Sequence, residues 1–506
     1  MEKDLQNRKT PLETDPEEFR RLGRWAVDRL ADLLQTLPQR PVTPGLSPRD
    51  IRGLLGDRPL PQQGISAETL LQESVDLLLE HSLFNGHPRF WGYITSSAAP
   101  IGALGELLAA AVNPNVGAWD LSPMATEIEA QTVRWIAELI GYPPACGGLL
   151  VSGGNMANFV GFLAARKAKV PWDLRAGGLR AGQQLTVYVS RETHTWIHKA
   201  ADLFGLGLNA IRWIPANERR QMDLQALEEQ ILADRGRGFL PLLVVGNAGT
   251  VAVGAIDPLP EIAVICRKHS IWFHVDGAYG APAAALPEAP AELAGLREAD
   301  SVALDPHKWL YSPLEAGCAL VREPRHLTEA FSFHPDYYNF ERPGEESPLN
   351  YHELGPQNSR GFRALKVWLA LRLGGRDGYV RMIGEDIALA RALYRMAETT
   401  VELQAFTQNL SITTFRFVPE ALSPGEPAVE RYLNDLNREI LNSLQAGGEV
   451  YLSHAVLDGT FVLRVCIVNF RTRLPDLEAL VEMVIRAGRA ADARMRPLFL
   501  REKQLT

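Results

Sequence analysis

Hydrophobic residues near the N-terminus recur at helical spacing. One such run extends from residue 16 to residue 37, and a second begins after Ser66 and continues to residue 79. Each run places apolar residues three or four positions apart and charged residues between them, which predicts two amphipathic helices, with Ser66 as the N-cap of the second. We expect these helices to form an N-terminal arm, residues 1–86, that packs on another surface such as a second subunit. A helix lying on a membrane surface is the alternative.

From His87 onward, helical patterns alternate with short apolar runs rich in β-branched residues. The runs are residues 148–152, 185–190, 241–246, 270–276 and 301–304. This alternation is typical of βαβ units and a mostly parallel sheet. Residues 87–375 are therefore predicted to form a large α/β domain.

The pattern changes after a glycine-rich stretch at Gly374, Gly375 and Gly378. A helix is predicted at 379–399, strands at 410–418 and 461–469, and a last helix at 475–494. Residues 376–506 therefore read as a smaller α+β domain.

Composition excludes several classes of function. The chain has 506 residues and a formal net charge of −8, so there is no electrostatic case for nucleic acid or an anionic membrane as the main partner. The four cysteines lie far apart and form no Cys-x-x-Cys pair, so we expect neither a disulfide framework nor a metal site. The N-terminus is charged and has no apolar signal segment, and we expect a cytoplasmic protein.

A lysine follows one of the predicted strands. The segment 301–309 reads Ser-Val-Ala-Leu-Asp-Pro-His-Lys-Trp, so it delivers His307 and Lys308 to the carboxyl end of a buried strand, where ligands bind in open α/β sheets. A lysine that is desolvated there has a lowered pKa and acts as a nucleophile toward a carbonyl. The alternative is a surface lysine in a loop.

An acid ends the preceding strand. The segment 270–279 reads Ser-Ile-Trp-Phe-His-Val-Asp-Gly-Ala-Tyr, with Asp276 after the apolar run. A buried carboxylate is costly without a cationic partner, and the protonated ring nitrogen of pyridoxal phosphate is such a partner. The alternative role for Asp276 is to cap the following turn.

A glycine turn follows the first strand, in the sequence Ser-Gly-Gly-Asn at 152–155. Backbone amides at the start of a helix form a cradle for phosphate. The segment is neither a Gly-x-Gly-x-x-Gly fingerprint nor a P-loop, which disfavours dinucleotides and nucleoside triphosphates. The alternative is a tight turn that binds nothing.

Two further segments follow strands. Residues 244–258 end a strand at Thr250 and predict a helix with Asp257 as N-cap and Pro258 at its first position. His194 follows another strand, and it either stacks on a cofactor ring or is a core histidine with satisfied hydrogen bonds.

Together, and in this order, these motifs resemble a group II decarboxylase among the fold-type I pyridoxal phosphate enzymes, specifically the aromatic L-amino acid decarboxylase family. The pair His-Val-Asp-Gly-Ala-Tyr at 274–279 and Asp-Pro-His-Lys-Trp at 305–309 carries the resemblance, which extends from His-Pro-Arg-Phe-Trp-Gly-Tyr at 87–93 through Trp-Asp-Leu-Ser-Pro at 119–123 to Phe-Arg-Ala-Leu-Lys-Val-Trp at 362–368. The resemblance implies a mostly parallel seven-stranded central sheet, pyridoxal 5'-phosphate as cofactor, and a homodimer with active sites at its interface.

The resemblance also implies roles for individual residues. Lys308 matches the lysine that carries the cofactor, and Asp276 the acid that faces the ring nitrogen. The other cofactor positions are His194 and Ala278 on the two faces of the ring, Thr250 supporting His194, and Gly153, Gly154, Asn155 and His307 around the phosphate. Asp305 stands where the family often has asparagine.

A long segment rich in proline, glycine and acids, residues 331–360, predicts a loop of the kind that closes over an active site. Within it Tyr337 matches the tyrosine that protonates the substrate Cα, and relatives that make aldehydes have phenylalanine there. The adjacent Tyr338 leaves the assignment open between the two residues. An exposed aromatic pair is the alternative.

Substrate positions are also implied. Tyr93 and Ser96 match pocket positions, whereas Asn85, Asn115 and Gly117 stand where relatives have aromatic or aliphatic walls, so we expect a more polar or roomier pocket with Asn115 and Gly117 contributed across the dimer interface. Ser359 matches a serine of plant relatives that act on phenolic substrates.

The sequence thus predicts a carboxy-lyase that converts an L-amino acid, most simply an aromatic one, into an amine and CO2. The alternatives are an aldehyde synthase, a decarboxylase of a non-aromatic amino acid such as glutamate or diaminobutyrate, and a catalytically silent protein that binds pyridoxal phosphate.

Overall fold

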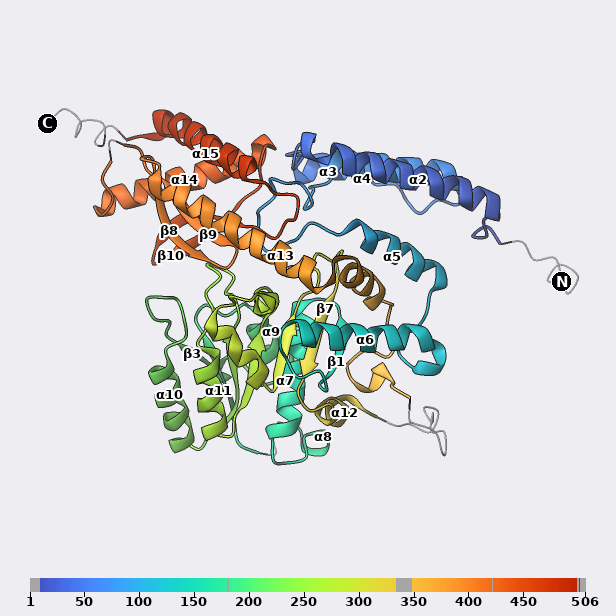
Figure 1. Ribbon diagram of the computed structural model, residues 1–506, viewed down its shortest axis with the longest axis vertical. Helices are drawn as coiled ribbons and strands as arrows, with labels where there is room; N and C mark the ends of the chain where they lie inside the picture. Colours follow the sequence, from blue (N-terminus) through green and yellow to red (C-terminus); the bar gives the residue numbers. More distant parts are fainter. Residues whose placement is uncertain (1–9, 180–181, 334–347, 421, 498–499, 501–506) are drawn as a thin grey trace, which may run out of the picture.

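The computed structural model describes residues 10–179, 182–333, 348–420, 422–497 and 500. Its centre is a seven-stranded sheet with the strand order β1-β7-β6-β5-β4-β2-β3 (Figure 1). The strands are β1 Gly147–Val151, β2 Leu185–Ser190, β3 Ile211–Ile214, β4 Leu240–Asn247, β5 Trp272–Asp276, β6 Ser301–Leu304 and β7 Gly317–Val321. Only β7 runs antiparallel to its neighbours β1 and β6. The predicted α/β fold with a mostly parallel seven-stranded sheet is confirmed, although β3 and β7 were not predicted.

Helices cover both faces of this sheet, which explains why its strands are mostly apolar and nearly all their residues are buried. Alternate residues of a strand point to opposite faces, so Leu150 belongs to one apolar cluster with residues of α6 Pro123–Leu139, α10 Leu224–Gly236 and α11 Leu259–Lys268. Leu149 and Val151 pack on the other side with α7 Gly154–Lys169, α9 Trp196–Leu203 and α12 Arg325–Phe331. A short helix, α8 Leu174–Gly177, follows α7.

A second, antiparallel sheet lies in the C-terminal part of the chain, with the order β10-β11-β9-β8. Its strands are β8 Leu403–Asn409, β9 Ile412–Phe417, β10 Ser453–Leu457 and β11 Thr460–Cys466, and it packs with α14 Pro427–Gly447 and α15 Leu474–Met495. The predicted strands at 410–418 and 461–469 and the last helix are confirmed within a few residues. The elements β8, β10 and α14 were not predicted.

The long helix α13, Ala364–Thr399, connects the two parts (Figure 1). It consists of two helices that meet at Gly375, where φ is 61° and the backbone leaves the helical conformation. Since a side chain is strained at such a φ, glycine suits this junction. The predicted limit between residues 375 and 376 falls at this point, and the division into three domains stays a prediction.

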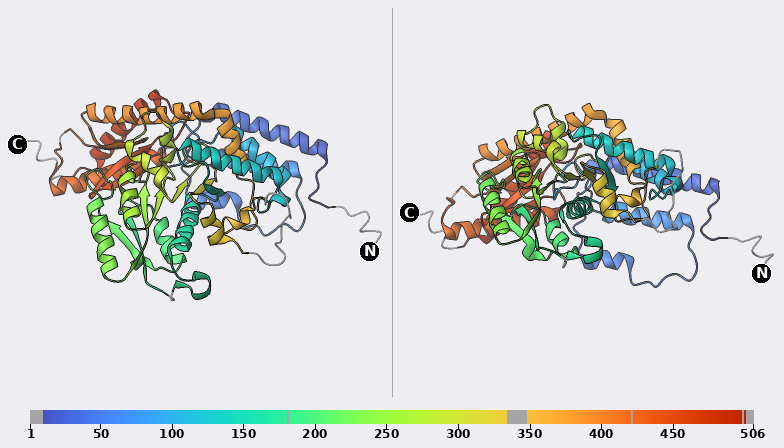
Figure 2. Two further views of the ribbon diagram at one scale, coloured as in Figure 1. Left: turned by 60° about the horizontal axis from the view of Figure 1, so that its bottom comes forward. Right: turned by 90° about the horizontal axis from the view of Figure 1, so that it is seen from below.

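The N-terminal helices are α2 Pro16–Thr36, α3 Pro48–Leu55 and α4 Ala67–His81, followed by α5 Pro100–Val112. The hydroxyl of Ser66 accepts a hydrogen bond from Thr69 N at 3.2 Å, which confirms it as the N-cap of α4. Arg21 of α2 and Glu68 of α4 form an ion pair at 3.0 Å, and Figure 2 shows that α2 projects beyond the body of the molecule. None of the described helices combines the length and apolar character needed to cross a membrane.

The prediction that Asp257 caps a helix is wrong. Helix α11 begins at Leu259, and no side chain caps it. The fully buried carboxylate of Asp257 instead accepts hydrogen bonds from Met222 N at 2.7 Å and from Asn247 N at 2.8 Å. It therefore joins the end of β4 to the loop that follows β3.

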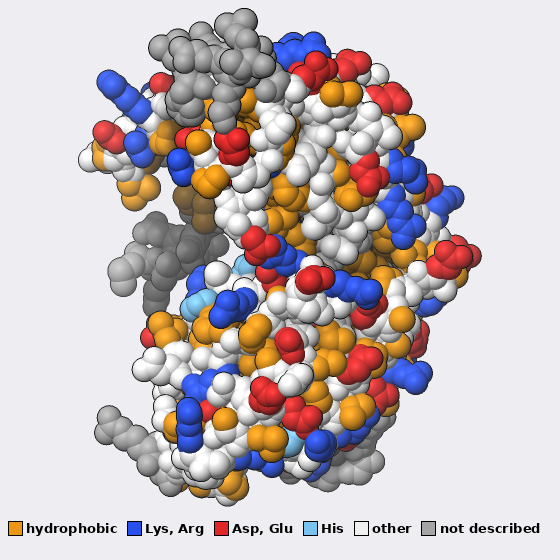
Figure 3. All heavy atoms as spheres, turned by 90° about the vertical axis from the view of Figure 1, so that its left-hand side faces the viewer, with side chains coloured by type: hydrophobic (Ala, Val, Ile, Leu, Met, Phe, Trp, Pro, Cys, Tyr) orange, Lys and Arg blue, Asp and Glu red, His pale blue; other side chains and the backbone are white. Residues whose placement is uncertain are grey.

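Acidic and basic side chains are interspersed over the face shown in Figure 3. Such a surface presents no single-sign field of the kind that nucleic acids require.

Candidate active site

A cavity of about 380 Å³ lies at the carboxyl ends of the central strands. All nine residues that the resemblance assigns to the cofactor line it: Gly153, Gly154, Asn155, His194, Thr250, Asp276, Ala278, His307 and Lys308. They come from the segments after β1, β2, β4, β5 and β6, because the ends of parallel strands meet at one edge of the sheet. The volume of the cavity is within the range of sites that bind small molecules.

Lys308 pairs with an acid inside the cavity. Its Nζ lies 3.0 Å from Oδ2 of Asp305, and its backbone N donates to the carbonyl of Asp305 at 2.9 Å. Asp305 is buried, and its Oδ1 has no hydrogen-bond partner among the residues that the structure describes. A buried carboxylate oxygen without a partner is costly, so this side of the cavity can accept a hydrogen bond from a bound group.

Asp276 is oriented by two donors. Its Oδ2 accepts from the indole Nε1 of Trp196 at 2.9 Å, and its Oδ1 accepts from Ala278 N at 3.2 Å. The residue is 8% exposed. The carboxylate is therefore held in one orientation at the end of β5, with a single face open to the cavity.

His194 lies on the loop between β2 and α9. Burial is the main cause that lowers the pKa of its ring, although the charge of Asp276 acts in the opposite direction. Its Nδ1 accepts from Trp196 N at 3.3 Å, so the neutral ring carries its hydrogen on Nε2. The buried hydroxyl of Thr250 accepts from Ala255 N at 3.0 Å, and among the described residues it makes no hydrogen bond to His194.

The glycine turn forms a cradle at the start of α7. Gly153 has φ of +89°, a backbone conformation that would strain any other residue, and a Cβ on Gly154 would lie 2.6 Å from Oδ2 of Asp305, which would have to move. The first amides of α7 have no partner within the helix and point at this space. The Nδ1 of His307 is engaged by the backbone of Ala316 at 2.7 Å, and its Nε2 lies 3.8 Å from Oδ2 of Asp305.

These residues fit pyridoxal phosphate. An amine suits its aldehyde, a carboxylate suits its ring nitrogen, and a glycine-lined helix start suits its phosphate. Oδ1 of Asp305, which has no hydrogen-bond partner among the described residues, marks a site shaped for a ligand, and the close approach of Gly154 to the same carboxylate places the glycine turn at the wall of that site.

Sequence reasoning missed the polar layer behind the cavity. His274 of β5 is fully buried, and its Nδ1 contacts the hydroxyl of Ser301 at 2.7 Å while its Nε2 contacts Oδ1 of Asn158 at 2.7 Å. Asn158 in turn donates to the carbonyl of Gly154 at 2.9 Å. The sequence feature that could have indicated this polar layer is His274 itself, a histidine within a mostly apolar strand.

The predicted substrate residues do not line the cavity of a single chain. Tyr93 is exposed and its ring lies 6.3 Å from that of Tyr451, and Asn85 lies in the turn after α4. The hydroxyl of Ser96 donates to the carbonyl of His307 at 2.8 Å, so it anchors the segment that carries Lys308.

Three other predicted substrate residues lie together. The Oδ1 of Asn115 accepts from Gly117 N and from Arg360 N, at 3.1 and 3.0 Å. A Cβ on Gly117 would lie 2.1 Å from the carbonyl oxygen of Asn358, so only glycine fits there. Ser359 is exposed beside this contact. The substrate roles of these residues stay predictions.

Tyr337 and Tyr338 lie outside the described residues. The described end of the predicted loop is packed: Tyr351 and Arg360 are buried, and the guanidinium of Arg360 lies 4.5 Å from the ring centre of Tyr351.

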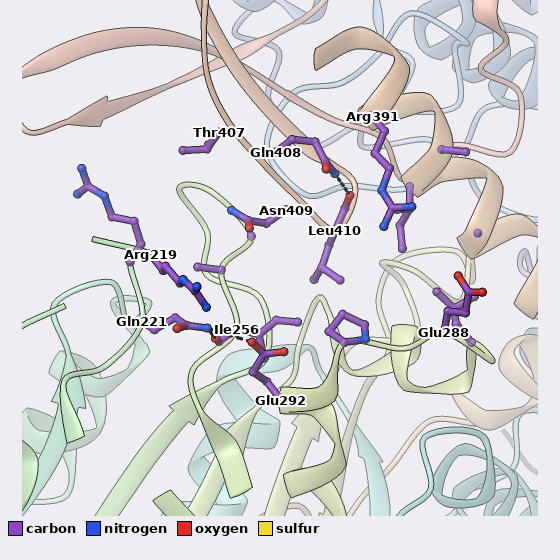
Figure 4. A pocket seen from close by; sticks show the side chains of 18 of the residues that line it. Arg219, Gln221, Ile256, Glu288, Glu292, Arg391, Thr407, Gln408, Asn409 and Leu410 are labelled. Carbon is purple, nitrogen blue, oxygen red and sulfur yellow. Dashed lines mark hydrogen bonds between the residues drawn. The ribbon is translucent and has the colours of Figure 1, made fainter. Parts of the chain in front are cut away.

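A larger groove of about 1290 Å³ lies elsewhere, between the loop after β3 and the C-terminal sheet. Figure 4 shows Arg219, Gln221 and Glu292 on one side of it and Arg391 and Gln408 on the other. It shares no lining residue with the cavity described above. We assign the chemistry to the smaller cavity because Lys308, Asp276 and His194 lie there and none of them lies in the groove.

Comparison with known proteins agrees with this assignment. The model of the pyridoxal-dependent decarboxylase conserved domain matches residues 48–418. An aromatic-L-amino-acid decarboxylase of Bacillus atrophaeus is 32% identical over 472 residues, 92% of this chain and 94% of that protein. A phenylacetaldehyde synthase of Petunia hybrida is 30% identical, with 93% and 94% covered. The crystal structure of Oryza sativa TDC with PLP and tryptamine has a TM-score of 0.88 at 26% identity, covering 95% of this chain and 99% of that one.

The fold and the cavity define a pyridoxal phosphate enzyme of fold type I. The chain belongs to the pyridoxal-dependent decarboxylase family, is a carboxy-lyase, and uses pyridoxal phosphate as its cofactor. The predicted family and cofactor are confirmed.

Proposed function

We propose that the protein decarboxylates an aromatic L-amino acid to the amine and CO2 in the cavity that contains Lys308 and Asp276. The observation that carries the proposal is that the lysine amine and the oriented carboxylate share one cavity at the edge of the sheet. The relatives support an aromatic substrate, since they include an aromatic-L-amino-acid decarboxylase and tyrosine and tryptophan decarboxylases.

Each cavity residue has a role in this proposal. Lys308 carries the cofactor through its amine, the start of α7 with His307 holds the phosphate, and Asp276 keeps a proton on the ring nitrogen. The bound cofactor supplies an electron-withdrawing ring that takes up the electron pair released when the bond from Cα to the carboxylate breaks. His194, kept uncharged by burial, lies against the ring together with Ala278, and both exclude water from it.

Protonation of Cα decides the product, and we assign it to Tyr337, with Tyr338 as the second candidate. The relatives include both decarboxylases and phenylacetaldehyde synthases, so an aldehyde synthase is the second candidate function. In the presence of dioxygen, which is reduced to peroxide, and of water, which supplies the aldehyde oxygen, a Tyr337→Phe variant should shift the products from amine toward aldehyde and ammonia. If amine formation persists at the wild-type rate, Tyr337 is not the acid, and Tyr338→Phe is the next test.

We propose that the working form is a homodimer. The N-terminal helices expose many large apolar side chains, among them Phe19, Leu30, Leu78, Leu107, Leu108 and Val112. Large exposed apolar surfaces mark interaction sites. The predicted substrate residues do not line the cavity of one chain, so its outer wall is missing. Asn115 and Gly117 of a second copy would supply that wall.

The dimer is tested by a Leu107→Glu and Leu108→Glu double variant, which should sediment as a monomer and lose decarboxylation. Leu232→Glu, which changes an equally exposed leucine on α10, should stay dimeric and active. A monomeric wild type would refute this part of the proposal.

We place the protein in the cytoplasm. All four cysteines are free, and Cys266, Cys318 and Cys466 are buried, as expected in a reducing compartment. Fractionation of cells with an antibody against the chain would test it, and recovery from a secreted fraction would refute it.

The decisive experiment is a panel of L-amino acids assayed together for CO2, amine and peroxide, followed by borohydride reduction and peptide mapping. We expect CO2 and amine in equal amounts from an aromatic substrate, and the cofactor fixed on Lys308. Turnover of glutamate or diaminobutyrate would favour a decarboxylase of a non-aromatic amino acid. A protein that is labelled but turns over none of the amino acids would favour a silent protein that binds pyridoxal phosphate. A label on another lysine would refute the mechanism.

A further inference from the structure

A buried acid on α13 holds the segment that carries Lys308. Asp386 is 2% exposed, and its Oδ2 accepts from the indole Nε1 of Trp309 at 2.9 Å and from the hydroxyl of Tyr311 at 2.7 Å. Trp309 and Tyr311 are the first and third residues after Lys308. One carboxylate oxygen therefore fixes the chain immediately after the lysine.

Packing does not explain an acid at this position. On α13 the neighbouring buried positions include Ile383, Ile387 and Ala390, which form the apolar face of the helix. Burial raises the pKa of Asp386 to about 7, even though hydrogen bonds from Tyr311, Trp309 and the backbone of Asn469 act in the opposite direction. An apolar side chain would avoid this desolvation cost, so the carboxylate serves the two donors.

Trp309 extends the contact to the other side of the cavity. Its ring stacks on Tyr279, with centroids 4.9 Å apart and planes 17° from parallel. Tyr279 lines the cavity three residues after Asp276, and its hydroxyl lies 2.6 Å from that of Ser411, next to β9. A shift of Trp309 would therefore disturb the lysine segment and the segment after β5 together.

Tyr311 shows that this segment is held under strain. Its φ is 52°, in the left-handed region, and its backbone N donates to the carbonyl of Lys308 at 3.1 Å. A residue other than glycine keeps such a conformation only when its surroundings impose it. The hydrogen bond from its hydroxyl to Asp386 is one constraint, and the edge contact of its ring with Phe470, at 5.4 Å, is another.

We propose that Asp386 is a positioning residue for decarboxylation: by accepting from Trp309 and Tyr311, it keeps the amine of Lys308 placed for the cofactor. This inference rests on the proposed function, in which Lys308 is the lysine that carries pyridoxal phosphate. Asp386 does not line the cavity, and it acts through the two aromatic residues.

Asp386 is the group that changes charge near neutral pH, because the titratable groups around it keep their charge state there. Burial raises the pKa of Tyr311 well above its ordinary value, and it raises the pKa of Cys466, so both stay uncharged. Tyr379, whose ring stacks on Tyr311, is also uncharged because burial raises its pKa. Glu385, the exposed neighbour on α13, adds a negative charge that raises the pKa of Asp386 further.

The test compares Asp386→Leu, which removes the acceptor, with Asp386→Asn, whose amide oxygen can still accept from both aromatic residues. Loss of hydrogen bonds to a charged group should weaken cofactor affinity and lower kcat by about tenfold or more in the leucine variant. The asparagine variant should keep both within about threefold of wild type, and its cofactor affinity should change less between pH 6 and 8.5 than that of wild type. In the wild type that affinity should weaken as Asp386 is protonated.

Asp234→Asn is the matched control. Asp234, on α10, is also a fully buried carboxylate that accepts from a tyrosine hydroxyl, that of Tyr188 at 2.9 Å; it also pairs with Arg212 at 2.8 Å, and it does not line the cavity. This variant should lower the melting temperature without changing cofactor affinity or its dependence on pH.

Cofactor affinity is measured by absorbance titration of the apoenzyme, and fold by far-ultraviolet circular dichroism. Wild-type affinity and kcat in a folded leucine variant would overturn the inference. An asparagine variant whose cofactor affinity depends on pH as in wild type would also overturn it, and this second test remains available if the leucine variant does not fold. Borohydride labelling of the wild type separates this result from the proposed function. A label away from Lys308 refutes the proposed function, whereas a label on Lys308 with no effect of Asp386 refutes only this inference.

Discussion

The indole nitrogen of Trp196 donates a hydrogen bond to Oδ2 of Asp276 over 2.9 Å, inside the wall of the cavity. The same tryptophan donates through its backbone N to Nδ1 of His194 at 3.3 Å. The first residue of α9 therefore orients both the acid at the end of β5 and the ring after β2. The cavity thus depends on a residue whose side chain is entirely buried behind it.

Replacing Trp196 with phenylalanine should lower kcat/KM by roughly 10-fold to 100-fold, since a hydrogen bond to a charged group contributes about 1.5–3 kcal/mol. The backbone contact to His194 would remain, so we expect cofactor binding to be weakened much less. Steady-state kinetics with a cofactor titration measures both effects. Trp213→Phe, a partly exposed tryptophan on β3, is the control and should behave as wild type; equal losses in both variants would point to a general packing defect.

Adding a methyl group to the glycine turn should block the phosphate cradle. A Cβ on Gly154 would lie 2.6 Å from Oδ2 of Asp305, so Gly154→Ala forces either the turn or the acid to move. We expect the dissociation constant for pyridoxal phosphate to rise at least tenfold, while affinity for pyridoxal, which lacks the phosphate, changes less. Gly236→Ala, in α10 with no atom within 4 Å of the added Cβ, should leave both affinities unchanged.

The residues of the cavity were predictable because each directly follows a buried strand. Strand sequences such as 270–276 are mostly apolar, and the edge at which they end follows from the parallel order of the sheet. The contacts made by Trp196, His274 and Asp386 were not predictable, because their partners lie far away in the sequence. A single buried polar residue in an apolar pattern does not reveal which donor or acceptor it meets.

The missed elements have similar causes. Strand β3 has only four residues, and its Arg212 and Trp213 are not fully buried, which obscures the apolar run. Strand β7 lies between β1 and β6 and runs antiparallel to both, although β1 and β6 are far apart in the sequence. No local pattern encodes that pairing.

The buried ring of His274 should make the protein sensitive to mild acid. Burial lowers its pKa from 6.5 to about 4, so between these values the unfolded chain binds a proton that the folded chain does not. Lowering the pH through this window therefore favours unfolding, by up to about 2 kcal/mol at pH 5 for this group. The melting temperature of His274→Gln should fall less between pH 7 and pH 5 than that of wild type, whereas His81→Gln on α4 should follow wild type. An identical fall in all three proteins would contradict the assignment.

The buried ion pair between Arg360 and Glu129 should be the strongest polar contact for stability in the segment that holds Asn115. Both side chains are at most 1% exposed. The guanidinium also donates to the carbonyl oxygens of Val116, at 2.9 Å, and Leu150, at 2.6 Å. It therefore ties the segment after α5 to β1.

Arg360→Gln leaves Glu129 buried without its cation, which should cost roughly 3–5 kcal/mol of unfolding free energy. Adding Glu129→Gln should restore part of that loss, because the uncompensated charge is then gone, and a double-mutant cycle on urea unfolding measures the difference. The exposed pair Arg267 and Glu298, 2.8 Å apart with side chains 60% and 41% exposed, is the control, and Arg267→Gln should cost less than about 1 kcal/mol. Similar costs for Arg360→Gln and Arg267→Gln would mean that water reaches the site of Arg360 in solution and that the ion pair does not hold the segment in place.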